Sequence, residues 1–303
     1  MRKILIVLLA LLASPVLFAA PLSMTEVAPG VYVHHGAHED LDEGYHGDIC
    51  NIGFIVGAKG VAIIDSGGSF AVGQQLRNAV RKVTKLPILY VINTHVHPDH
   101  IFGNAAFLQD KPEFVGHANL AGAMDARGEI YLRNITTWLG DAAKGSEIVK
   151  PTQSVADTLE IDLGNRVLLL TAFPVAHTNT DITVLDRASA TLWTGDLLFV
   201  ERTPSLDGDI NGWLAAIEKL RGVPALRAIP GHGAVVSDVS LALNDEQRYL
   251  ETLLADIRAA IKEGKSMEQT MDSAAASERD HWALFNAVNR RNINLLYPKL
   301  EWE

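Results

Sequence analysis

The sequence predicts an α/β (α+β) protein whose core carries an additional helical region at its C-terminal end. Two groups of short β-branched or aromatic runs, each with a helical stretch beside it, indicate two similar halves of one core. Beyond Gly233 the pattern changes to long helical periodicity. A chain of 303 residues that is 48% hydrophobic can also bury a substantial core, which argues against a disordered protein.

The expected strands are bounded by Gly, Pro or Asp, as short β-strands usually are. In the first half they cover residues 31–33, 52–56, 61–64 and 88–92, with an amphipathic helix over 71–84 between the third and the fourth. A helix over 120–139 leads to the second half, whose strands cover 158–161, 167–173, 182–186 and 191–193, and helical periodicity returns over 239–262 and 282–296. We therefore expect a catalytic domain over 23–235 and a helical extension over 236–303 that packs on it.

The first 22 residues have the pattern of a secretory signal peptide. A cationic start with Arg2 and Lys3 is followed by an apolar run over 4–18 and by the small residues Ala19 and Ala20. The run is shorter than the roughly 20 residues that a membrane-spanning helix needs, so we expect cleavage and no permanent membrane anchor. The protein is therefore expected to be secreted, or periplasmic if its source is bacterial.

Charge and cysteine content exclude two classes of protein. The chain has 26 Lys and Arg against 36 Asp and Glu, a net charge of -10, so we expect no nucleic-acid partner. Its single cysteine, Cys50, can form neither an internal disulfide nor a multi-cysteine zinc site. Because Cys50 begins an apolar strand, we expect it to be a buried structural thiol.

A cluster of three histidines and one aspartate follows the expected strand over 88–92. In the string Thr94-His95-Val96-His97-Pro98-Asp99-His100, two histidines spaced two apart in an extended segment can face one ion. Asp99 and His100 lie beyond a proline and are turned toward a second position. Imidazole nitrogens together with carboxylate oxygens are the ligand set that zinc prefers and that iron or manganese also accept. The string therefore predicts a metal site.

Three further residues lie at similar places downstream. His177 and Asp196 each follow an expected strand of the second half, and His232 ends a further strand expected after a helix over 210–220. Taken singly, Asp196 could cap a helix and His232 could belong to a turn. Strand-to-loop junctions on one edge of a sheet converge on a single site, so the co-occurrence of all three favours a shared metal centre.

With these residues in this order, the chain from Val27 to Gly233 resembles the metallo-β-lactamase fold superfamily. The resemblance implies a four-layer αββα sandwich, here with a C-terminal helical extension, and two zinc ions, or iron or manganese, between its sheets. By this resemblance one metal would be held by His95, His97 and His177 and the other by Asp99, His100 and His232, with Asp196 bridging both. Asp65, in Ile64-Asp65-Ser66-Gly67, corresponds to an aspartate that supports the histidine loop without binding metal.

The bridging Asp196 is similar to that of thioesterases resembling glyoxalase II, and dedicated β-lactamases usually lack it. Segments 26–34 and 194–208 resemble exported metallohydrolases associated with bacterial sulfur oxidation and quinoprotein alcohol-oxidation systems. The resemblance implies a small-molecule hydrolase in which a metal-bridged hydroxide, oriented by the catalytic Asp99, attacks the carbonyl of a thioester or related acyl compound. Three alternatives stay open: a β-lactamase or lactonase-type hydrolase, a mononuclear iron persulfide dioxygenase, and a non-catalytic zinc-binding partner of a periplasmic oxidation system.

Other polar residues give weaker signals. Arg202 could bind a substrate carboxylate or form an internal salt bridge. The polar stretch over 34–46 is expected to be a loop that either gates the site or is merely solvated, and its histidines could recruit zinc. Tyr131 and Trp138 are expected to pack in the interior instead of lining a pocket, and we assign only structural roles to His117 and His281.

Overall fold

The computed structural model describes residues 22–41 and 45–302 of the chain. The expected signal peptide, apart from Leu22, lies outside the described residues, as do residues 42–44 of the polar loop. Among the helices of the described part, none is long and apolar enough to cross a membrane.

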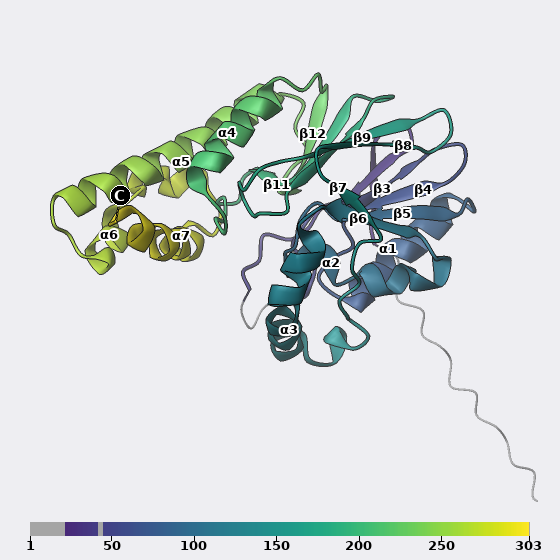
Figure 1. Cartoon of the computed structure of the whole chain (residues 1–303), viewed down its shortest axis with the longest axis horizontal. Helices are drawn as coiled ribbons and strands as arrows, with labels where there is room; N and C mark the ends of the chain where they lie inside the picture. Colours follow the sequence, from purple (N-terminus) through teal and green to yellow (C-terminus); the bar gives the residue numbers. More distant parts are fainter. Residues whose placement is uncertain (1–21, 42–44, 303) are drawn as a thin grey trace, which may run out of the picture.

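Two β-sheets face each other at the centre of the molecule (Figure 1). The first has seven strands in sequence order: β1 (Thr25–Ala28), β2 (Val31–His34), β3 (Ile52–Val56), β4 (Val61–Ile64), β5 (Ile88–Ile92), β6 (Glu113–His117) and β7 (Gln153–Val155). Strands β1 to β4 pair antiparallel and β4 to β7 pair parallel. The parallel half brings the carboxyl ends of β4 and β5 to one edge, where the histidine loop begins.

The second sheet has five strands. They are β8 (Thr158–Asp162), β9 (Val167–Ala172), β10 (Ile182–Asp186), β11 (Thr191–Phe199) and β12 (Arg227–His232), ordered β12-β11-β10-β9-β8. All neighbours pair antiparallel except β11 and β12, which run parallel. Strand β11 is longer than the sequence predicted, because it continues through a bulge at Gly195. Asp196 therefore lies within a strand and not, as expected, at its end.

Alternating side chains along the strands explain the layering. Ile55 and Ile64 point inward, into a cluster shared with Leu170 and Val184 of the second sheet. Their neighbours Phe54 and Ile63 point outward, onto the helix α1 (Phe70–Val83). Apolar residues that alternate between a sheet-facing and a helix-facing cluster give each sheet two buried faces.

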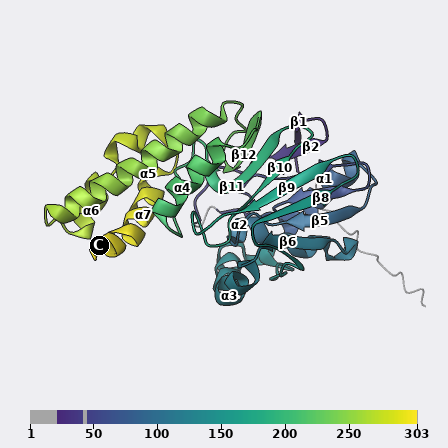
Figure 2. The ribbon, with the colours of Figure 1, turned by 45° about the horizontal axis from the view of Figure 1, so that its top comes forward.

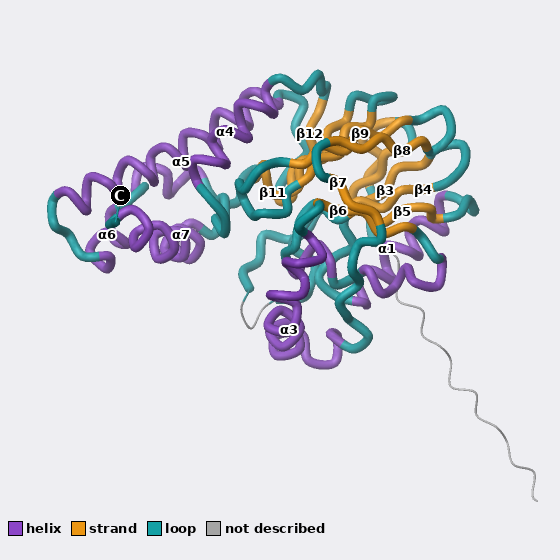
Figure 3. Tube along the Cα trace, viewed as in Figure 1, coloured by secondary structure: helices purple, strands orange, loops and turns teal. Residues whose placement is uncertain are grey.

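Helices cover the outer faces of both sheets (Figure 3). On the first sheet this is α1, and on the second they are α4 (Ile210–Arg221) and α5 (Val239–Lys262). Helix α3 (Leu120–Leu139) lies beside the sandwich, where it packs against α2 (Pro98–Ile101). Trp213 of α4 and Tyr249 of α5 are fully buried in one cluster with Leu192 of β11. The order helix, sheet, sheet, helix confirms the four-layer αββα fold.

The chain ends in helices that extend away from the sandwich (Figure 2). After α5 come α6 (Met267–Ser273), the short 3-10 helix η3 (Ala276–His281) and α7 (Phe285–Leu300). A capping box between Ser266 and Gln269 begins α6. Sequence periodicity predicted α5 to the residue, but it missed the seven-residue α6, the three-residue β7, and also β1 and β6.

Candidate metal centre

The histidine loop is held by Asp65, the residue that follows β4. Its backbone adopts the left-handed region with φ 52°, and its carboxylate accepts hydrogen bonds from the backbone N–H and the hydroxyl of Thr94, both at 2.8 Å. The same carboxylate lies 2.8 Å from Nδ1 of His100. Because that nitrogen is engaged, the Nε2 atom of His100 is left to face the other candidate ligands.

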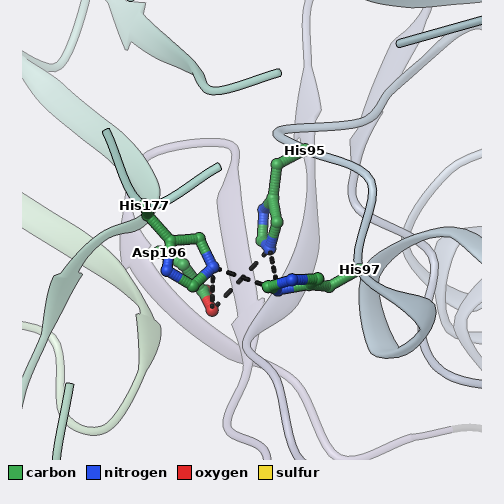
Figure 4. Close-up of side chains that lie close together, drawn as sticks. All are labelled: His95, His97, His177 and Asp196. Atoms are coloured by element: carbon green, nitrogen blue, oxygen red, sulfur yellow. Dashed lines mark hydrogen bonds and ion pairs between the residues drawn. The ribbon is translucent and has the colours of Figure 1, made fainter. Parts of the chain in front are cut away.

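Three imidazole nitrogens converge on one point beside β5. Nδ1 of His97 lies 3.1 Å from Nε2 of His95 and 3.0 Å from Nε2 of His177. Figure 4 shows these rings reaching the site from two separate segments, with the carboxylate of Asp196 beside them. Oδ2 of Asp196 lies 3.4 Å from the His177 nitrogen and 3.7 Å from that of His95.

A second group of ligand atoms lies on the other side of Asp196. Oδ2 of Asp99 is 3.4 Å from Nε2 of His100 and 3.4 Å from Nε2 of His232. Asp196 reaches these histidines too, with Oδ1 3.2 Å from His100 and Oδ2 3.3 Å from His232. One carboxylate is therefore shared by both groups, and all seven residues expected to bind metal lie together.

Hydrogen bonds place two of the three distant ligands, His177 and His232. His177 belongs to a turn in which Asp181 accepts hydrogen bonds from the N–H and hydroxyl of Thr178, while Thr180 accepts from the N–H of Val96. Nδ1 of His232 lies 2.7 Å from the carbonyl oxygen of Ile49, between the two sheets. These contacts fix the ligand-bearing segments of both halves relative to each other.

The donor atoms fit a pair of small divalent cations. Nε2 of His100 and Oδ1 of Asp196 are buried and lie 3.2 Å apart, but they form no hydrogen bond with each other or with any other described residue. Two ligands at zinc bond lengths in a tetrahedral arrangement are roughly 3.3 Å apart, which matches the separations above. Buried polar atoms without a hydrogen-bond partner lower the stability of the folded protein unless a ligand binds them. The donor set is therefore that of a metal centre.

Burial and neighbouring charges set the protonation of these donors. Burial, reinforced by His100, holds the pKa of His95 well below its usual value, and burial lowers the pKa of His177 to about 3. Burial acts to raise the pKa of Asp99, but the adjacent His100 and His232 lower it overall. These shifts favour neutral His95 and His177 and an ionised Asp99, which are the forms that bind metal.

Asp207 is a site residue that the sequence analysis missed. Its carboxylate lies 3.1 Å from Nε2 of His97, on the side of the ring away from the other ligands. The guanidinium of Arg127, from α3, donates to the same carboxylate. No spacing rule could find this contact, because 110 residues separate His97 from Asp207.

Cys50 is buried, as expected, but it also adjoins the second group of ligands. Its thiol donates a hydrogen bond to the carbonyl oxygen of Asp99 at 2.8 Å, and its sulfur lies within 4.8 Å of donor atoms of Asp99 and His100. Burial raises the pKa of the thiol well above its usual value. Because its thiol hydrogen is engaged by the backbone carbonyl of Asp99, Cys50 supports the segment that carries Asp99 and His100.

A pocket of about 290 Å³ opens over the two groups of ligands. Metal-site residues His97, Asp99, Asp196 and His232 form part of its lining. Tyr131 and Trp138 line the pocket too, so the expectation that they only pack in the interior was wrong. One side of α3 borders the pocket, and the same two rings also contact the buried residues of that helix.

Leu41 of the polar loop and Arg291 of α7 also line this pocket. The loop is tied to the helical extension there, because Arg291 donates hydrogen bonds to the Asp40 carboxylate at 2.7 and 3.0 Å. Among the described residues the loop histidines belong to no metal-ligand group: His34 contacts Asp48 at 2.9 Å and His46 contacts Glu39 at 3.1 Å.

The two remaining histidines lie away from the ligand groups. Nδ1 of His117 accepts a hydrogen bond from the N–H of Asn119 at 3.0 Å. His281 borders a different pocket, between the end of β11 and α5.

Comparisons with known proteins agree with this architecture. A model of the metallo-beta-lactamase superfamily matches residues 46–232. Two curated relatives are a beta-lactamase-like protein 2 homolog of Caenorhabditis elegans, 25% identical over 230 residues, and a linear primary-alkylsulfatase of Pseudomonas sp. (strain ATCC 19151), 26% identical over 215 residues. The matches cover 72% and 59% of this chain but only 66% and 40% of those proteins, less than two thirds of either.

Solved structures with the same fold include a metallo-beta-lactamase from Pontibacter korlensis and the protein TMB-1. The first has a TM-score of 0.62 at 20% identity and covers 76% of this chain and 99% of its own. The second has a TM-score of 0.60 at 18% identity and covers 76% of this chain and 97% of its own. At this level of identity the likeness concerns the fold alone.

Proposed function

Because this chain belongs to the metallo-beta-lactamase superfamily and keeps an intact histidine and aspartate metal site, we propose that it is a dinuclear zinc hydrolase of thioesters or related acyl compounds. One observation carries the proposal: two complete groups of buried donors meet at the carboxylate of Asp196. A protein that binds a single ion would need only one of these two groups of ligands, so the pair favours a dinuclear site.

The chain's own residues divide the work in this proposal. His95, His97 and His177 would hold one cation, Asp99, His100 and His232 the other, and Asp196 both. Two cations held in this way polarise a carbonyl oxygen and lower the pKa of water. Asp99 is kept ionised and lines the pocket, so it can orient the attacking water and accept a proton from it.

The position of Cys50 argues against a mechanism in which its thiol attacks the substrate. Cys50 lies beneath Asp99 with its thiol engaged by a backbone carbonyl, and only 1% of the residue is exposed. Tyr131 and Trp138 give the pocket an aromatic lining, which suits an acyl chain. Hydrolysis by activated water is therefore the reaction that these residues support.

A thioester is the preferred substrate class for two reasons. A departing thiolate is a good ligand for zinc, and a bridging aspartate is similar to that of thioesterases. The Pseudomonas relative is named as an alkylsulfatase, which makes sulfate esters the second class to test. Asp196 argues against a dedicated β-lactamase, and the complete second donor group argues against a mononuclear iron oxygenase.

We also propose that the protein is exported and acts outside the cytosol, on the strength of its N-terminal sequence pattern. A non-catalytic partner of a periplasmic oxidation system is the remaining alternative. A non-catalytic protein would not need a pocket that leaves the metal-site residues His97, Asp99 and His232 open to a small molecule.

Metal content and turnover of the purified protein test the proposal together. We expect close to two zinc ions per chain by elemental mass spectrometry, and cleavage of a thioester that Asp99→Ala lowers about a hundredfold or more while the circular dichroism spectrum is unchanged. Asp48→Ala is the matched control, because within residues 22–41 and 45–302 the hydrogen-bond partner of that carboxylate is the loop histidine His34. One iron per chain without hydrolysis, or full turnover by Asp99→Ala, would refute the mechanism.

A further inference from the structure

Two residues near the metal centre, Arg202 and His177, have buried nitrogens without a hydrogen-bond partner among the described residues. In Arg202 these are Nε and Nη1, and a ligand in the pocket does not reach them because the protein encloses both. In His177 it is Nδ1, whereas Nε2 faces the other ligand atoms. His177 is therefore a candidate metal ligand whose second nitrogen is not held by a hydrogen bond to a described residue.

The other candidate histidine ligands are all held at the nitrogen that faces away from the metal centre. An oxygen atom lies between 2.7 and 3.1 Å from that nitrogen in each of them: Thr94 for His95, Asp207 for His97, Asp65 for His100 and Ile49 for His232. Such partners fix the tautomer and the orientation of a metal-binding imidazole. The ring of His177 must be oriented in another way.

Aromatic rings surround His177 in place of oxygen atoms. Its imidazole lies edge to face with the indole of Trp213, with ring centroids 5.1 Å apart and an interplanar angle of 68°. Phe199 is a second neighbour at 5.8 Å, but its ring also stacks on His232 at 5.0 Å and 13°. Trp213 is fully buried, and its Nε1–H donates to the carbonyl oxygen of Leu197 at 3.3 Å, which fixes the indole. The face of that indole is thus the best acceptor near Nδ1.

The local sequence explains how Trp213 reaches the imidazole. Helix α4 begins on the turn that carries His177, because the N–H of Gly208 donates to the carbonyl oxygen of His177 at 2.7 Å. Gly212 lets the first turn of the helix come close, since a Cβ atom there would lie 2.0 Å from the carbonyl oxygen of Val175. The next residue is Trp213, so this close approach places the indole against the ligand.

We propose that Trp213 positions His177 for metal binding, because the indole face accepts an N–H···π hydrogen bond from Nδ1–H of that histidine. A neutral imidazole that binds metal through Nε2 carries its proton on Nδ1. The electron-rich face of an aromatic ring attracts such a proton, and the attraction grows when the imidazole gives up electron density to a cation. The inference deepens the proposed function and rests on it for the presence of the metal, but not for the identity of the substrate.

Nuclear magnetic resonance of the zinc-loaded protein, with histidine labelled by nitrogen-15, observes this proton directly. Hydrogen bonds to oxygen shift an N–H signal downfield, whereas the ring current of an indole shields a proton above its face. We therefore expect one ligand N–H signal, that of His177, upfield of the signals from the other ligand histidines. Trp213→Leu should abolish this upfield signal, and Trp213→Phe should keep it with a smaller shift.

Zinc affinity, measured by competition with a chromophoric chelator, is the second readout. Trp213→Leu should weaken the affinity for one of the two ions about tenfold, as expected for the loss of a partner of a metal-binding histidine, and Trp213→Phe should restore most of it. Trp282→Leu is the matched control, because Trp282 belongs to the same apolar cluster but its ring packs on Tyr249 at 5.8 Å. It should change neither the zinc affinity nor the upfield signal.

The absence of an upfield ligand signal from the parent protein, or an upfield signal that Trp213→Leu leaves in place, would overturn the inference. The parent spectrum decides the question even where Trp213→Leu fails to fold. An upfield signal that depends on Trp213, found without thioester cleavage, would refute only the proposed function. Thioester cleavage by a zinc-loaded protein without that signal would refute only the present inference.

Discussion

The carboxylate of Asp207 lies 3.1 Å from Nε2 of His97, while Nδ1 of the same ring faces His95 and His177. A carboxylate on the far nitrogen fixes the tautomer of a metal-binding imidazole and makes it a better donor. His97 and Arg127 hold the pKa of Asp207 well below its usual value although burial acts to raise it. The link thus connects helix α3 to the three-histidine group.

Replacing Asp207 by Asn should therefore weaken metal binding without unfolding the protein. We expect roughly a 10–100-fold loss of zinc affinity for one of the two ions, measured by competition with a chromophoric chelator. Asp141→Asn, at an exposed site paired with Lys144, is the control. Unchanged affinity for both ions would show that Asp207 does not support His97.

Gly231 is required by the close approach of Asp196. A Cβ atom at Gly231 would lie 1.8 Å from Oδ1 of Asp196 and 2.8 Å from the backbone of Gly195. We expect Gly231→Ala to displace the shared carboxylate, so that metal content falls below two ions per chain and the melting temperature drops. Gly122→Ala meets open space on α3 and should leave metal content unchanged. Full metal loading of Gly231→Ala would contradict the bridging position of Asp196.

The sequence predicted the contiguous part of this site better than its surroundings. His95, His97, Asp99 and His100 stand out because six residues of one loop carry them all, and local spacing alone predicts a metal site. Asp207 is an isolated aspartate in a polar segment, and its role depends on a contact between the two halves of the fold. Sequence periodicity cannot report such a contact.

The same physical reason explains the differences in the fold. Strand β7 has three residues, too few to show alternation, and β11 crosses a bulge where Gly195 and Asp196 imitate the end of a strand. Helix α5, with 24 residues and a continuous apolar face, was predicted to the residue. Long periodic elements are visible in a sequence, and a short strand is visible where turn residues bound a β-branched run, as at β4 (Val61–Ile64).

Glu246 of α5 is expected to make stability depend on pH. It is fully buried, its Oε1 accepts the N–H of Phe199 at 2.8 Å, and Oε2 has no partner among the described residues. Burial raises its pKa well above the usual value, so the folded state holds the neutral acid. Its favourable contribution is complete below the unfolded pKa of about 4.3 and is lost as the pH rises toward the folded pKa.

Glu246→Gln removes this titration and can keep the hydrogen bond to Phe199. The free energy of unfolding of the variant minus that of the parent should therefore be larger at pH 8 than at pH 5. The increase should be about 1.4 kcal/mol for each pH unit above 5 over which Glu246 stays protonated in the folded protein. Urea unfolding at both values measures the difference. Glu251→Gln, at an exposed position of α5, controls for the lost charge. A stability difference between Glu246→Gln and the parent that does not vary with pH would mean that Glu246 is ionised in the fold.

The helical extension packs into the same apolar cluster as the second sheet. Leu250 and Leu253 of α5 and Ile293 of α7 are buried there together with Trp213 and Phe199. Asn292 of α7 also donates to the carbonyl of Pro204 at 2.8 Å and accepts from the N–H of Leu206 at 2.9 Å, on either side of Ser205 in the pocket wall. The extension therefore supports the segment that carries Arg202 and Asp207.

Truncation after residue 235 should consequently destroy the fold of the second half as well as the pocket. Fully burying one large apolar side chain stabilises the folded state by roughly 1.5–3 kcal/mol. The stability lost by exposing several of them therefore exceeds the free energy of unfolding of a typical domain. We expect an insoluble product. Asn292→Ala tests whether the extension also positions the pocket wall. We expect this variant to be soluble but to have a higher KM, because the segment near Arg202 loses two hydrogen bonds. A soluble truncated chain with the KM of the parent would show that the helices are dispensable for substrate binding.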